Sequence, residues 1–202
     1  IARAELYEER RGISANYSDI TDHDVFWETL GPDGSNIKMD DLSIWNAVED
    51  AEDKILAKRY KDPEIRAQKI NEAVPAYSDH LALPKELTKE QNIELAREFI
   101  QRRYVDKGLI VTYSIHWEEG NPHLHYVYSA RQYIDGEFSQ VKTVSRETRG
   151  PKGGYETRVI LADIINKYQE MLGIQDRIDH RSYAERGLDL IPTQHKGWMS
   201  HQ

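Results

Sequence analysis

Residues 109–133 constrain the fold more than any other part of the chain, because their pattern predicts two strands joined by a tight turn. Polar and apolar residues alternate over residues 111–116, and residues 124–128 are rich in β-branched and aromatic side chains. Residues 118–122 between them contain Gly, Asn and Pro, which are typical of turns. The pattern predicts an antiparallel hairpin.

Three histidines of this hairpin are expected to share one face. Side chains two apart on a strand project to the same side, so His123 and His125 lie together. His116 can join them from the neighbouring strand, because opposed side chains across a hairpin are about 5 Å apart. Three converging imidazoles predict a metal site with open positions. The alternative is that they are surface or core histidines without a ligand role.

Composition narrows the possibilities. A chain of 202 residues suits a single domain, and the absence of cysteine excludes disulfides and thiolate ligands, so histidines and carboxylates would have to hold any metal. No apolar run is long enough to cross a bilayer and no signal peptide is evident, so we expect a cytoplasmic protein without membrane insertion. The net charge of −8 argues against a general nucleic-acid binder, although basic residues gather locally at 97–107 and 146–158.

The remaining sequence predicts helices and short strands around the hairpin. Residues 145–157 are rich in Gly and basic side chains and are expected to form a loop. Helices are expected at residues 1–12, from Asp40 to Pro63, from there to Pro75, from the capping box Thr88-Lys-Glu-Gln91 to Gly108, and at 159–172. Strands are expected at 80–84 and 138–141, and residues 25–27 are expected to form either a short strand or an apolar plug. The order predicts an α+β domain whose antiparallel sheet is covered by helices on one face.

The hairpin SIHWEEGNPHLHYVYSAR resembles the signature of the MobA/MobL (MobQ-type) conjugative relaxases, which belong to the HUH endonuclease superfamily. Further blocks resemble this family in the expected order, namely LYEERRG, SIWNAVEDAE, LALPKEL and RIDHRSYAERGLDLIPTQHKG. The resemblance covers nearly the whole chain. It implies one relaxase domain over residues 1–202 with an antiparallel sheet palm, which nicks one DNA strand at a plasmid or conjugative-element transfer origin.

The resemblance also implies the chemistry. His116, His123 and His125 would hold a divalent ion, Mg²⁺ or Mn²⁺, although three imidazoles also suit Zn²⁺, Co²⁺ or Ni²⁺ in crystals. A tyrosine would displace the 3′ oxygen of the scissile phosphate and leave a 5′-phosphotyrosyl intermediate. The implied partners are single-stranded origin DNA, the relaxosome and type IV secretion coupling proteins.

The N-terminus departs from the family pattern. Alignment on Leu6-Tyr7-Glu8-Glu9-Arg10 places the nucleophilic tyrosine just before Ile1, so this chain is expected to lack its first strand and its nucleophile. Tyr7 belongs to the aligned block itself and is a weak substitute.

Other residues have two open interpretations. His80 occupies a position where many relatives carry Glu, and could line the metal site or orient a ligand as easily as pack in the core. Arg131 could contact phosphate through its planar fork. His180 and Arg181 are candidate DNA contacts, but together with Asp179 they could equally form a local ion-paired turn. Arg149 and Lys152 are also candidate DNA contacts, and the alternative for them is an ordinary solvated face.

Two other functions compete with the relaxase hypothesis. A His₃ zinc hydrolase would need a general base, for which Glu118 and Glu119 are the nearest carboxylates in sequence. A catalytically inactive relaxase remnant would bind metal or single-stranded DNA without cleaving it.

Overall fold

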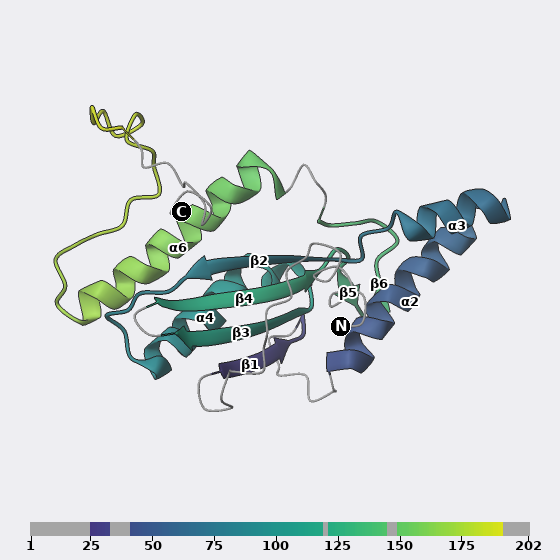
Figure 1. Ribbon diagram of the computed structural model, residues 1–202, viewed down its shortest axis with the longest axis horizontal. Coiled ribbons are helices and arrows are strands. Elements are labelled where there is room, and N and C mark those ends of the chain that lie inside the picture. Colours follow the sequence, from purple (N-terminus) through teal and green to yellow (C-terminus); the bar gives the residue numbers. More distant parts are fainter. Residues whose placement is uncertain (1–24, 33–40, 119–120, 145–148, 192–202) are drawn as a thin grey trace, which may run out of the picture.

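Figure 1 shows the computed structural model, which describes residues 25–32, 41–118, 121–144 and 149–191. A four-stranded sheet lies at its centre, with the strand order β1-β3-β4-β2 and antiparallel pairing throughout. Its strands are β1 (Val25–Leu30), β2 (Ala76–Ala82), β3 (Val111–Glu118) and β4 (Asn121–Ser129), and a small separate sheet pairs β5 (Tyr133–Ile134) with β6 (Glu137–Phe138). The predicted α+β class with an antiparallel sheet is confirmed.

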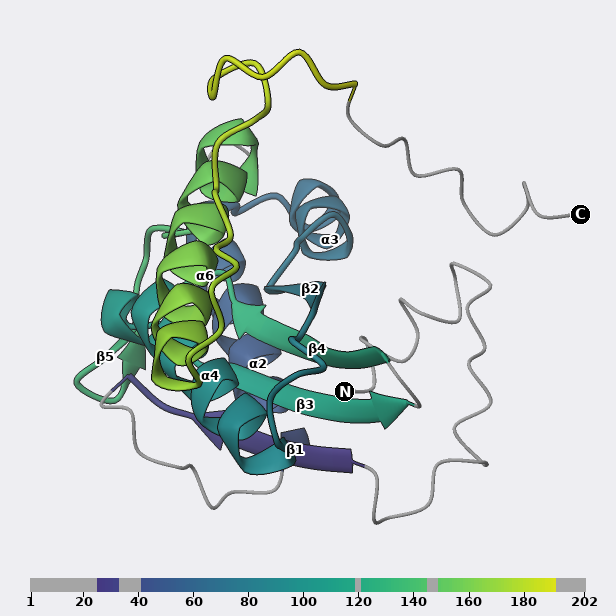
Figure 2. The ribbon, with the colours of Figure 1, turned by 90° about the vertical axis from the view of Figure 1, so that its left-hand side faces the viewer.

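Helices α4 (Lys89–Arg103) and α6 (Pro151–Met171) lie on the same side of the sheet (Figure 2). The predicted capping box starts α4, since Thr88 accepts a hydrogen bond from the backbone N–H of Gln91 and the Gln91 side chain accepts one from that of Thr88. The 3₁₀ turn Val105–Lys107 follows and ends at Gly108, whose φ of 78° is left-handed. The core between helices and sheet includes Leu95, Phe99, Ile100, Val111, Tyr113, Ile115 and Leu124.

Helix α2 (Asp41–Arg59) packs against the opposite face, at one end only, which corrects the expectation of helices on a single face. Trp45 and Val48 lie against Val127, and the Trp45 indole Nε1 donates to Thr112 Oγ1 at 3.1 Å. Thr112 and Val127 are opposed in β3 and β4 and belong to the face that α4 and α6 do not cover. Helix α3 (Pro63–Asn71) follows α2 and has no buried residue.

Several predicted boundaries shift. Residues 151–157 form the start of α6 rather than a loop: Pro151 supplies a helical φ at the first position, and Gly153 is buried. Strand β2 begins at Ala76, before the predicted residue 80, and the return strand is limited to Glu137–Phe138. The helix expected at residues 1–12 lies outside the described residues. In the described parts of the chain, no helix is both long and apolar enough to cross a membrane.

Candidate metal centre

His116, His123 and His125 come together where β3 and β4 face each other. His116 is directly opposite His123, and His125 lies two residues further along β4 on the same face. The ring centroids are 5.2 Å apart for His116 and His123, 4.7 Å for His116 and His125, and 4.8 Å for His123 and His125. One ring nitrogen from each lies within 4.8 Å of the other two. The predicted convergence of the three side chains is therefore present.

This donor set fits a divalent ion. A metal–nitrogen distance of about 2.1 Å places neighbouring ligand nitrogens about 3 to 3.5 Å apart, so small ring rotations would close the site. His123 Nδ1 lies 2.9 Å from the carbonyl oxygen of Asn121. In the tautomer in which Nδ1 carries the proton and donates to this carbonyl, Nε2 keeps a free lone pair for a metal ion. Ser114 Oγ lies 3.3 Å from His116 Nε2.

The electrostatics also favour a neutral imidazole at His125. Burial, together with the neighbouring His116, His123 and His80, lowers the pKa of His125 to about 4. His125 is therefore uncharged at neutral pH and can donate its lone pair to a cation. The cluster resembles a preformed ligand set more closely than a group of solvated surface histidines.

His80 extends the cluster across the sheet. It lies directly opposite His125 in the β2–β4 pairing, and the two rings stack at a centroid distance of 5.8 Å. The same pairing places Ala82 opposite His123. His80 thus borders the histidine cluster from an edge strand, where it can contact His125 but is not one of the three converging ligands.

Arg131 has a different environment from the one expected of a DNA contact. It is 5% exposed, and its Nε and Nη2 donate to both carboxylate oxygens of Glu52 in α2. Its Nη1 donates to the carbonyls of Ser139 and Gln140. Lys142 also lies 3.1 Å from Glu52. The donors that a phosphate would need are already occupied, so Arg131 fastens β4 to α2 and the following loop.

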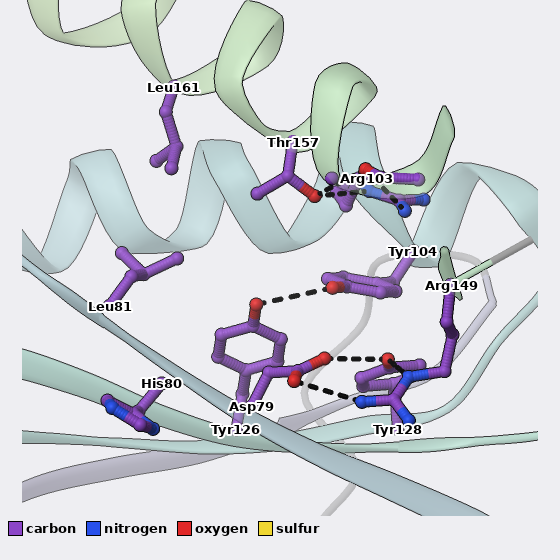
Figure 3. Close-up of a pocket in the computed structure, with 12 residues that line it drawn as sticks. Asp79, His80, Leu81, Arg103, Tyr104, Tyr126, Tyr128, Arg149, Thr157 and Leu161 are labelled. Atoms are coloured by element: carbon purple, nitrogen blue, oxygen red, sulfur yellow. Dashed lines mark hydrogen bonds and ion pairs between the residues drawn. The ribbon is translucent and has the colours of Figure 1, made fainter. Parts of the chain in front are cut away.

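Arg149 lines a cavity of about 250 Å³ between α6, α4 and the strands (Figure 3). The strand register places its partners Asp79 and Tyr128 on the sheet face opposite the histidine cluster. Arg149 Nη2 donates to Asp79 at 3.0 Å and its Nε donates to the Tyr128 hydroxyl at 2.8 Å. Its guanidinium also stacks over the ring of Tyr77 at 4.4 Å. Lys152 is exposed in the first turn of α6. Neither is on the histidine face.

His180 and Arg181 form the local turn that was the alternative to a DNA contact. Arg181 donates to both carboxylate oxygens of Asp179, which holds the pKa of that carboxyl well below its usual range. His180 Nε2 lies 3.2 Å from the Tyr155 hydroxyl of α6. Tyr7 and Glu119 lie outside the described residues, and the side chain of Glu118 is not described.

The sequence profile of the MobA/MobL family matches residues 1–202. The chain belongs to this family. A probable conjugal transfer protein TraA of Sinorhizobium fredii is 31% identical over 176 residues, which is 77% of this chain and 14% of that protein. Mobilization protein A of Escherichia coli is 33% identical over 132 residues, which is 57% of this chain and 19% of that protein.

A solved structure has a similar fold. A solved structure concerning the molecular basis of vancomycin resistance transfer in Staphylococcus aureus matches with a TM-score of 0.58 and 27% identity, covering 83% of this chain and 79% of that one. The chain spans less than a fifth of the length of the TraA and mobilization protein A relatives. The family resemblance predicted from the hairpin is confirmed.

Proposed function

We propose that this chain carries the metal-dependent nicking site of a conjugative relaxase, which cuts one DNA strand at a transfer origin. Membership of the MobA/MobL family supports a role in conjugative DNA processing. The observation that carries the proposal is the convergence of His116, His123 and His125 on a sheet face that α4 and α6 do not cover. A phosphodiester can reach such a face, whereas it could not reach a site within the core.

In this proposal the three histidines hold a divalent ion, Mg²⁺ or Mn²⁺, with Zn²⁺, Co²⁺ or Ni²⁺ as ions that three imidazoles also accept. When bound, the ion polarises the scissile phosphate and takes up charge that develops during strand transfer. The Asn121 carbonyl orients the His123 ring by accepting from Nδ1. His80 supports His125 by stacking against it.

The nucleophile is proposed to be a tyrosine outside the described residues. The tyrosines of the three strands β2, β3 and β4, namely Tyr77, Tyr113, Tyr126 and Tyr128, lie on the helix-covered face. Burial raises the pKa of the hydroxyls of Tyr113, Tyr126 and Tyr128, which makes them poor nucleophiles. The alignment on Leu6 to Arg10 favours a tyrosine upstream of Ile1, with Tyr7 as the weaker candidate. Attack by such a hydroxyl would form a 5′-phosphotyrosyl bond and release the 3′ hydroxyl.

The proposed partners are single-stranded origin DNA and, through the transfer process, the relaxosome and type IV secretion coupling proteins. Arg149, Lys152, His180 and Arg181 lie on or beside α6, so in this proposal they do not touch the scissile phosphate. Any contact they make with DNA would be to flanking nucleotides.

The full-length gene product, incubated with Mn²⁺ and labelled single-stranded DNA of its own origin, is expected to form a covalent adduct that survives denaturing electrophoresis. His123→Ala should abolish the adduct. It should also weaken Mn²⁺ binding in calorimetry by more than about 100-fold, since even outer partners of metal ligands contribute about 10- to 100-fold. His180→Ala is the matched control, because that histidine lies against α6 and not in the cluster.

Two other results would replace the proposal. DNA binding without any adduct by the full-length protein would indicate an inactive remnant. Hydrolysis of small esters with Zn²⁺, independent of DNA and lost in His123→Ala, would indicate a zinc hydrolase.

A further inference from the structure

Trp27 is the most exposed aromatic side chain among the described residues, with 60% of its surface accessible. It lies in β1, at an edge of the sheet. Its neighbour Glu28 turns inward and is 6% exposed, because successive side chains of a strand point to opposite faces. Trp27 therefore projects from the face that carries the histidines.

The strand register aligns Trp27 with the histidine cluster. Trp27 lies opposite Ser114 in β3, and Ser114 lies opposite His125 in β4. His80 of β2 completes this row across all four strands. Two strand spacings place the backbones of Trp27 and His125 about 10 Å apart, and the residue between them is a small serine. A single DNA strand with a phosphate at the histidines can therefore reach the indole.

Helix α2 covers this face from the next row onward, in the direction away from the histidines. Thr29 and Thr112 form that row, their hydroxyls are 2.8 Å apart, and Trp45 of α2 donates to Thr112. Trp27 is thus the first residue of β1 beyond the cover of α2. The Trp27 ring is exposed beside the histidine cluster, whereas the aromatic rings of the core are buried and pack against one another.

The charge of the protein favours stacking as a source of affinity. With a net charge of −8, the chain has no overall positive field to attract the phosphate backbone. Stacking of bases on an aromatic ring does not depend on charge and accepts every base, because each has a π face. An exposed tryptophan beside the proposed phosphate site supplies this contact.

We infer that Trp27 is a stacking platform for one nucleobase of the DNA strand that is held at the histidine cluster. This inference rests on the proposed function and deepens it by naming a residue that binds the substrate strand. The contact is independent of base identity and of the metal. Trp27 therefore contributes to affinity and to the position of the strand, while the histidines contribute to the chemistry.

Equilibrium binding of the full-length protein to a fluorescent single-stranded origin oligonucleotide tests the inference. Trp27→Ala should raise the dissociation constant by about 5- to 150-fold, the range expected for one stacked base. Trp27→Tyr should restore most of the affinity. The slope of log K against log salt should stay the same, because no ionic contact is lost. Ile65→Ala is the control, since it removes an exposed apolar side chain from α3.

A scan with single abasic sites locates the contact. In the parent protein, an abasic site at one position near the nick should weaken DNA binding. In Trp27→Ala, an abasic site at that position should no longer change the affinity, while abasic sites at other positions should have the same effect as in the parent. Equal affinities of parent and Trp27→Ala, or an abasic profile that Trp27→Ala does not change, would overturn the inference. So would a change in oligomeric state in Trp27→Ala, measured by light scattering, with unchanged DNA affinity.

The two proposals fail separately. If the parent forms the covalent adduct but Trp27→Ala binds DNA as tightly as the parent, only the stacking role is lost. If binding depends on Trp27 but the full-length parent never forms an adduct, the nicking function is lost and the stacking role stands.

Discussion

The two faces of the central sheet are built from the same strands, but one face packs in the core and the other carries the histidine cluster. On β3 and β4, Tyr113, Ile115 and Leu124 point toward α4 and α6 and are almost fully buried. Residues one position away, including His116 and His125, point to the other face, which α2 covers only at one end. A shift of one residue in register would exchange the two sets. We therefore expect substitutions on the core face to change stability, and substitutions on the histidine face to change the proposed metal binding.

The largest expected effect is on the helix-covered face. Phe99 of α4 is 0% exposed and packs edge-on against the rings of Tyr104 and Tyr126. Phe99→Ala should lower the free energy of unfolding by about 3 to 5 kcal/mol, because it leaves a cavity in the core. Urea unfolding followed by circular dichroism measures the loss. If Phe99→Ala lowered the free energy of unfolding by no more than a substitution of an exposed residue does, the helix-covered face would not be the one that stabilises the fold.

Substitution of Arg131 distinguishes a structural role of this arginine from a contact with DNA. Arg131→Ala should cost about 3 kcal/mol, because Glu52 then stays buried with only Lys142 beside it. Burial tends to raise the pKa of Glu52, but the hydrogen bonds and charges of Arg131 and Lys142 outweigh burial and lower it from 4.5.

The stabilisation by Glu52 depends on pH. A lowered pKa means that the carboxylate of Glu52 stabilises the fold above its ordinary pKa of 4.5, and that this contribution is lost as the pH falls through the lowered folded value. The difference between parent and Arg131→Ala in urea unfolding should therefore be full at neutral pH and shrink below pH 4.5. Unchanged stability together with weaker DNA binding would instead make Arg131 a phosphate contact.

On the open face, metal should matter more than packing. Mn²⁺ at a concentration of about 100 times its Kd should raise the free energy of unfolding of the parent by about 2.7 kcal/mol. His125→Ala should abolish this gain, because it removes one of the three converging imidazoles. Thermal melts with and without Mn²⁺, followed by chelation to restore the first curve, measure it. The same gain in both proteins would place the ion elsewhere.

The smallest expected effect concerns the start of α4. Thr88→Ala should lower the free energy of unfolding by about 1 kcal/mol, because the backbone N–H of Gln91 loses its acceptor. Thr88→Ser should recover the loss, since serine caps equally well. Metal affinity should not change in either variant, because α4 packs on the face away from the histidines. A change in metal affinity would show that the two faces are coupled.

Local pattern was enough to predict the hairpin, the capping box and the convergence of three histidines, because each depends on residues close in sequence. It failed at residues 151–157, where glycines suggested a loop. There α6 packs beside α4, and Arg103 donates to Thr157 and to the carbonyl of Gly153. It also failed to show that Arg131 is buried, since the partner Glu52 is 79 residues away.

The sequence by itself determined which residues of the hairpin share a face, and with them the proposed ligand set and the family resemblance, because alternation along a strand is a local property. Only the tertiary structure decided that α2 stops short of the histidines, that Arg131 pairs with Glu52, and that Trp27 lies in one row with His125 and His80. These features depend on how distant segments pair and pack. The pairing of distant segments depends on which apolar and charged side chains become buried against one another, and the partners of these side chains are not close in the sequence.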